Sequence, residues 1–166
     1  AGLCAPFIER VALVVDPDDD ELDRVIGAIS PHRIQLHGSE TPERVAEIKR
    51  RTHRPVIKAL GVSSADDLKI ARDYDGVADW FLFDAKPPAE GLPGGNGEAF
   101  DWQILDGYTG AAPWLLAGGL TPDNVETAMM RTKAKMVDVS SGVETAPGDK
   151  DFGLMRAFVE AAKKGR

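Results

Sequence analysis

The sequence contains a single cysteine, Cys4, among its 166 residues. One cysteine cannot form a disulfide within the chain or assemble a cysteine-based metal site. Basic residues are also too few to balance the acidic ones, because the formal net charge is -7. Nucleic acids and anionic membranes are recognised by basic surfaces, so neither is expected as a partner.

Long apolar runs are missing as well. The longest, at residues 11–15 and 114–117, are far shorter than the roughly 20 residues that a membrane helix needs. The first residues also lack the basic stretch and apolar core of a signal peptide. We therefore expect a cytoplasmic protein. A chain of 166 residues that is 43% hydrophobic fits one domain, which we place at 1–166.

One pattern recurs along the chain: a short apolar run, a polar turn and an amphipathic stretch of helical period. It is typical of strands buried on both faces that alternate with helices. Thr41 with Pro42 predicts a helix cap and first helical residue, and Thr121 with Pro122 repeats the pair. A last helix is expected over 152–163. The predicted strands are 10–16, 33–37, 56–60, 80–84, 114–118 and 136–140.

About six such units in series imply a parallel sheet. An open doubly wound sheet would favour a glycine-rich turn after the first strand, where this chain has Asp16 followed by Pro-Asp-Asp-Asp. The phosphate-type loops follow the last two strands instead, as in a TIM (β/α)8 barrel. Since a barrel needs eight units, we expect an incomplete one, with units 3 to 8 present.

Two glycine-containing loops, 117–121 and 139–144, follow the last two predicted strands. Glycine lets the backbone approach an oxyanion, and free N–H groups then bind phosphate. The alternative is that the glycines only permit tight turns. The predicted phosphate-binding residues are Gly118, Gly119, Ser140, Ser141 and Gly142.

Four polar residues lie in or at the ends of predicted strands. Asp84 could be a general acid whose pKa is raised by apolar neighbours, or could cap a loop or pair with Lys86. Asp138 faces either a polar site or a structural partner. His37 could contact substrate or only bond to a loop. Lys58 could point into the barrel mouth or neutralise an inner carboxylate.

The connection over residues 86–99 is rich in proline and glycine and is long for a loop between a strand and a helix. Connections of this kind are either disordered or functional. The run of glycines at 94–97 would give a closing lid its backbone freedom. A closing lid and a disordered loop are therefore the two alternatives for this connection.

Five motifs stand out along the chain: QLHG at 35–38, FDAK at 83–86, PGGNGEAFDW at 93–102, AGGLTPDNV at 117–125 and DVSSGVE at 138–144. They occur in the order in which similar motifs follow one another in phosphoribosylanthranilate isomerases of tryptophan biosynthesis, and the chain closely resembles that family. The resemblance implies an Amadori rearrangement without metal or organic cofactor, acting on a phosphorylated sugar. It further implies that Asp84 protonates the ribose ring oxygen, that His37 and Asp138 line the pocket, and that the two loops hold the phosphate.

Two departures from the family pattern matter. The family's general base is a cysteine in a Lys-Ile-Cys-Gly-type motif, and an arginine helps hold the anthranilate; neither motif occurs here. Cys4 is expected to be a packing residue instead. We expect the chain alone to be inactive, or to dimerise or aggregate through exposed barrel edges. A different phosphate-sugar barrel enzyme and a non-catalytic phosphate-binding remnant are the alternatives.

Overall fold

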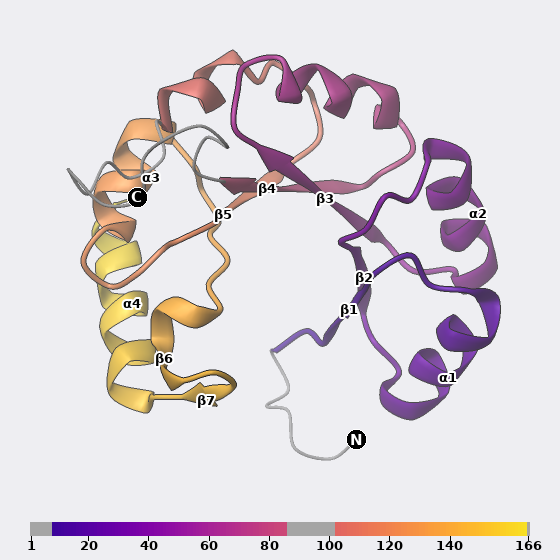
Figure 1. The fold of residues 1–166 in the computed structure, drawn as a ribbon, viewed down its shortest axis with the longest axis horizontal. Coiled ribbons are helices and arrows are strands. Elements are labelled where there is room, and N and C mark those ends of the chain that lie inside the picture. The colour runs from indigo at the N-terminus through magenta and orange to yellow at the C-terminus, as the bar shows by residue number, and fades with distance from the viewer. Residues whose placement is uncertain (1–7, 86–101, 166) are drawn as a thin grey trace.

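The computed structural model describes residues 8–85 and 102–165. Within them one parallel sheet curls into an open ring, and helices cover its outer face (Figure 1). The incomplete barrel is the fold that the sequence predicted. The strands, in spatial and chain order, are β1 (Val11–Val14), β2 (Arg33–Leu36), β3 (Val56–Val62), β4 (Trp80–Ala85) and β5 (Trp114–Ala117). The helices are α1 (Asp19–Ile29), α2 (Pro42–Thr52), the 3₁₀ helices η1 (Asp67–Tyr74) and η2 (Trp102–Gly107), α3 (Val125–Thr132) and α4 (Phe152–Lys164).

The prediction of a sixth strand at 136–140 was wrong, because these residues do not form one. Val137 forms only a parallel bridge with Leu116, through hydrogen bonds of 3.0 and 2.8 Å on either side of Leu116. The chain then turns into a short 3₁₀ helix, η3 (Ser141–Val143), and an antiparallel hairpin of β6 (Glu144–Ala146) and β7 (Asp149–Lys150). No second strand lies beside this segment among the described residues, so nothing extends its pairing.

The two Thr-Pro pairs behave differently. Thr41 caps α2 by accepting a hydrogen bond from the Arg44 N–H at 3.3 Å, and Pro42 is the first helical residue, as predicted. Thr121 does not cap α3, which begins only at Val125. Asn124 is the reason, because its side chain accepts from the Thr121 N–H at 2.8 Å and donates to the Gly119 carbonyl at 2.9 Å. Those bonds shape the preceding loop instead.

The main core lies between the outer face of the sheet and the helices. A smaller cluster on the inner face is built on Ile57, Ala59, Leu82 and Ala117. Strand β1 shows this division most clearly, since its inner face stays open to solvent. Ala12 and Val14 are buried against the helices, whereas Leu13 is 57% exposed.

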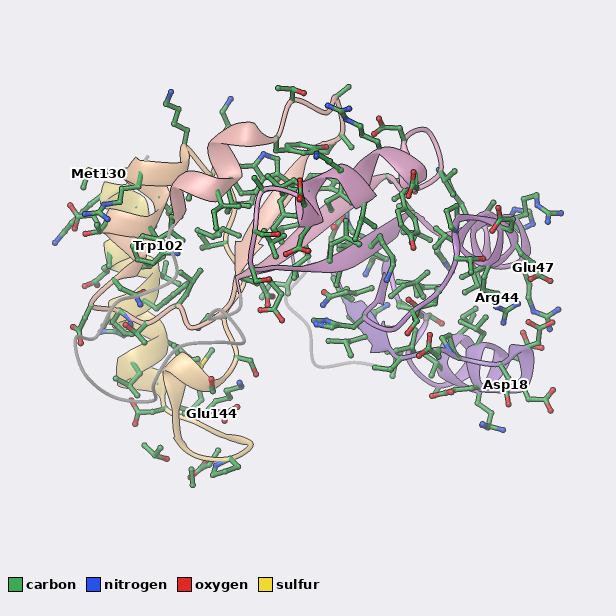
Figure 2. All side chains as sticks on the ribbon, turned by 45° about the horizontal axis from the view of Figure 1, so that its top comes forward. Asp18, Arg44, Glu47, Trp102, Met130 and Glu144 are labelled. Atoms are coloured by element: carbon green, nitrogen blue, oxygen red, sulfur yellow. The ribbon has the colours of Figure 1, made fainter. Side chains whose placement is uncertain are left out.

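Ion pairs join α1 and α2 on the outside of the ring. Arg44 bonds to Asp19 of α1 at 2.9 Å and to Glu47 of its own helix at 2.8 Å, and Figure 2 shows Arg44 and Glu47 beside the Asp18 end of α1. Among the described residues, every helix is too short or too polar to cross a membrane.

Candidate active site at the carboxyl ends of the strands

The register of the sheet brings the predicted acidic residues to one edge. Asp84 near the end of β4 pairs with Gly61 of β3 and Ala117 of β5. Asp138 donates its N–H to the Leu116 carbonyl at 2.8 Å and so lies on the other side of β5. His37 follows β2 directly. Since the carboxyl ends of parallel strands share one edge, all three residues belong to one region.

His37 and Asp84 face each other. The imidazole Nε2 lies 3.7 Å from Asp84 Oδ2, and the two side chains are 33% and 26% exposed. On the other side of the ring, Nδ1 lies 3.1 Å from the amide nitrogen of the buried Gln35. Gln35 therefore holds the ring so that Nε2 points at the carboxyl group. An imidazole and a carboxyl group so arranged can pass a proton between them after small movements.

The surroundings of Asp138 disfavour its charged form. Desolvation raises the pKa of its carboxyl group above the ordinary value of 3.8, and the nearby Asp84 raises it further. His37 and Lys150 act in the opposite direction but do not cancel the shift. Although Asp138 is an exposed residue, the protein atoms around its carboxyl group remove part of its hydration and so disfavour the charged form. Asp138 therefore takes up a proton more readily than an ordinary aspartate.

The two glycine-containing loops touch. Gly118 and Gly119 have φ angles of 92° and 61°, a left-handed conformation that glycine adopts without strain. Gly142 lies so close to the carbonyl oxygen of Leu120 that a Cβ atom would overlap it. The predicted loops therefore form one continuous surface, next to Ala117 and hence next to Asp84.

Lys150 was missed by the sequence argument. Its ammonium group donates to the Ser140 carbonyl at 2.8 Å and to the Glu144 carboxylate at 2.6 Å, and it lowers the Glu144 pKa through that bond. Glu144 begins the hairpin that carries Lys150 (Figure 2). The signal was the Pro147-Gly148 pair, which is typical of a turn and would have indicated the hairpin.

Lys58 neutralises a buried carboxylate, as one of the two alternatives raised for it proposed, but that carboxylate lies on the helix-facing side of β3 and not inside the ring. Lys58 alternates along the strand with Ile57 and Ala59 of the inner cluster, and its ammonium group lies over the Tyr74 ring of η1. Its Nζ lies 2.9 Å from Glu40 Oε2, and the two side chains are 2% and 1% exposed. Glu40 itself was missed. A lysine within a buried strand requires a counter-charge, and Glu40 lies three residues after His37 at the same edge of the sheet.

Three expectations lie outside the described residues. They concern packing of Cys4, pairing of Asp84 with Lys86, and a lid over 86–99.

Known proteins resemble this chain over nearly its whole length. The model of the family described as N-(5'phosphoribosyl)anthranilate (PRA) isomerase matches residues 5–161. An N-(5'-phosphoribosyl)anthranilate isomerase of Paracoccus denitrificans is 55% identical over 156 residues, which cover 93% of this chain and 73% of that protein.

Solved structures agree. The phosphoribosyl anthranilate isomerase of Thermotoga maritima superposes with a TM-score of 0.81 at 35% identity, covering 96% of this chain and 75% of the other. A second isomerase structure, in complex with reduced 1-(o-carboxyphenylamino)-1-deoxyribulose 5-phosphate, gives a TM-score of 0.78 at 32% identity and covers 97% and 74% of the two chains. The chain thus spans about three quarters of the length of these proteins.

Proposed function

Because the chain belongs to the N-(5'-phosphoribosyl)anthranilate isomerase family, we propose that the carboxyl edge of its sheet binds and rearranges N-(5'-phosphoribosyl)anthranilate. The reaction is an Amadori rearrangement in tryptophan biosynthesis and yields 1-(2-carboxyphenylamino)-1-deoxyribulose 5-phosphate. The contact between His37 and Asp84, beside the touching glycine loops, is the observation that carries the proposal.

Asp84 acts as the general acid. Its carboxyl group gives a proton to the ribose ring oxygen, the bond from that oxygen to C1′ breaks, and the anthranilate nitrogen supplies the electron pair that forms a C=N bond. Asp84, whose side chain is 26% exposed, regains its proton from water between turnovers, and His37 Nε2, 3.7 Å away, orients its carboxyl group. Loss of the C2′ proton to a base then gives the enol form, which becomes the ketone. The family resemblance assigns that base to a cysteine motif absent from these residues, so the proposal here covers the acid half of the reaction.

The glycine loops hold the phosphate. Gly118 and Gly119 after β5, with Ser140, Ser141 and Gly142 after the Asp138 segment, present backbone to one surface, and backbone N–H groups bind phosphate without a cationic side chain. Lys150, whose charge is paired with Glu144, also donates to the Ser140 carbonyl and so fixes the second loop. A phosphate held by these loops places the ribose next to Asp84. Asp84 of β4 lies opposite Ala117 of β5, and Ala117 directly precedes Gly118 in the first glycine loop.

Asp138 is assigned to the ribose. Its carboxyl oxygens can accept hydrogen bonds from sugar hydroxyls, and its raised pKa means that it takes up a proton more readily than an ordinary aspartate. It sits across β5 from Asp84. His37 and Asp138 thus lie on either side of the acid and orient the substrate against it.

The test is turnover of N-(5'-phosphoribosyl)anthranilate, followed by fluorescence. We would compare the 166-residue chain with a fusion that places the first two β-α units of the Paracoccus denitrificans relative before it. We expect the fusion to turn over, and Asp84→Asn to lower its rate by about 100- to 10,000-fold. Equal rates for the fusion and its Asp84→Asn variant would refute the role of Asp84. A folded fusion without turnover would refute the function.

A further inference from the structure

The buried ion pair between Glu40 and Lys58 forms hydrogen bonds with the backbone of Gly38, the residue that follows His37. Gly38 donates its N–H to the two Glu40 carboxylate oxygens at 3.2 and 3.1 Å. The Gly38 carbonyl accepts from Lys58 Nζ at 2.7 Å. Both polar backbone atoms of Gly38 are therefore held, one by each member of the pair.

The pair also ties the ends of β1 and β2 to the middle of β3. Glu40 Oε1 accepts the Asp16 N–H, just beyond β1, at 2.9 Å, while Lys58 belongs to β3. The Tyr74 hydroxyl donates to the Glu40 carbonyl at 2.8 Å and so fixes Glu40 from the side of η1. A Cβ atom on Gly38 would meet the Asp16 carboxyl group at 2.5 Å. The loop after β2 consequently has little freedom to move.

Stability alone is a poor reason for such a pair. Removing two charges from water costs several kcal/mol per ion, and apolar residues of similar volume often serve as well or better. The pair instead fixes the backbone conformation of Gly38, and because Gly38 follows His37 directly, it also limits the orientation of the His37 ring. It does so without adding net charge to the region where His37 faces Asp84 and Asp138.

We propose that Glu40 and Lys58 are positioning residues that hold His37 against Asp84. This inference rests on the proposed function for its catalytic consequence, but its structural part stands on the contacts of Gly38. If the pair were absent, the loop after β2 would relax and the 3.7 Å approach of His37 to Asp84 would be lost. Misplacements of about 1 Å can cost about 100-fold in rate.

The test uses Glu40→Gln, which keeps the shape of the side chain, and the double variant Glu40→Gln with Lys58→Met, which leaves no unpaired buried charge. Asp79→Asn is the matched control. Asp79 also pairs with a lysine, Lys49 at 2.7 Å, and accepts a backbone N–H, from Val56 at 2.9 Å, but it lies at the opposite ends of the strands. That end of a barrel governs stability, not catalysis. Four properties are measured: the NMR signals of the His37 ring, the exchange rate of the Gly38 amide hydrogen, the melting midpoint, and the kinetic constants. The kcat and KM values are measured per folded molecule in the fusion that carries the first two β-α units of the Paracoccus denitrificans relative.

We expect the double variant to melt close to the wild type, yet to show shifted His37 ring signals, faster Gly38 exchange and a kcat lowered by about 10- to 100-fold at nearly unchanged KM. Asp79→Asn should lower only the melting midpoint. Glu40→Gln or double variants that keep the wild-type ring signals and kcat would overturn the proposal. Shifted ring signals in a protein whose wild type shows no turnover would contradict the proposed function while supporting the positioning role.

Discussion

The carboxyl group of Asp138 illustrates how a residue that we assign to substrate binding can oppose folding. Its pKa is raised in the folded chain, chiefly by desolvation, so ionising it costs more in the folded than in the unfolded state. The cost is absent below the unfolded value of 3.8 and grows as the pH rises through the folded pKa. We predict that Asp138→Asn raises the melting midpoint at pH 7 and lowers turnover.

Thermal unfolding at a series of pH values checks this, because the gain should shrink as the pH falls toward 3.8. Asp123→Asn is the control, an exposed aspartate on the loop before α3. A melting midpoint for Asp138→Asn that stays below the wild type at pH 7 would contradict the argument.

Gly142 tests the contact between the two loops. Its Cβ position is already filled by the Leu120 carbonyl oxygen, so alanine must push the loops apart. We predict that Gly142→Ala weakens binding of inorganic phosphate, measured by calorimetry, by about tenfold or more. The matched control is Gly27→Ala in α1, where no atom lies within 4 Å of the added Cβ. That change should instead stabilise the chain by about 0.5–1 kcal/mol. If Gly142→Ala bound phosphate as tightly as the wild type, the claim that the two touching loops form the phosphate site would be wrong.

At the residue scale the sequence located the groups that sit at strand ends, because alternation of apolar runs and turns marks those ends. His37 and Asp84 were found in this way, and the structure brings them together. Glu40 and Lys150 were not found, since their importance lies in partners 18 and 10 residues away along the chain. Spacing alone does not reveal such pairs.

At the scale of the element, helix α3 and the loop before it depend on Asn124. Its two hydrogen bonds, to Thr121 and Gly119, hold the loop that carries Gly118. We predict that Asn124→Ala weakens phosphate binding severalfold and also lowers stability by about 1 kcal/mol. Chemical denaturation and phosphate titration measure the two effects.

The control is Asp18→Ala, which removes the cap of α1, where Asp18 accepts the Glu21 N–H at 2.7 Å. Its loss should cost about 1 kcal/mol and leave phosphate binding unchanged. If both variants weakened phosphate binding equally, the effect would be one of general stability and the role of Asn124 in the loop would be wrong.

The Thr-Pro pairs show where local prediction stops. Thr41-Pro42 begins a helix as its residue types favour, whereas Thr121-Pro122 lies in a loop because Asn124 offers the backbone other hydrogen bonds. The segment 136–140 has the apolar composition of a strand but only one neighbouring strand among the described residues. Strand formation needs partners, which composition does not encode.

At the scale of the whole molecule, the sheet forms an open ring that begins with strand β1 (Figure 1), and apolar side chains on and just after β1 are exposed. Leu13 and Val15 are each 57% exposed, and Val11 is 43% exposed. Unpaired strand edges with apolar side chains favour association. We predict that the 166 residues by themselves self-associate at micromolar concentrations, as analytical ultracentrifugation would show.

Leu13→Lys should shift this equilibrium toward the monomer by about tenfold or more, since a charge on an edge strand opposes pairing. Ile70→Lys, at an exposed position of η1, is the control and should have no such effect. A wild-type chain that stays monomeric at every concentration would contradict the prediction.

The central claim is that His37, Asp84, Asp138 and the two glycine loops form one site. The most direct measurement is an NMR titration of the labelled chain, first with inorganic phosphate and then with reduced 1-(o-carboxyphenylamino)-1-deoxyribulose 5-phosphate. The account predicts that phosphate shifts the amide signals of Gly118, Gly119 and Gly142, and that the larger ligand also shifts the His37 ring and the two carboxyl groups. The claim of one site would be contradicted if the larger ligand bound saturably but left unchanged either the glycine amide signals or the signals of His37, Asp84 and Asp138.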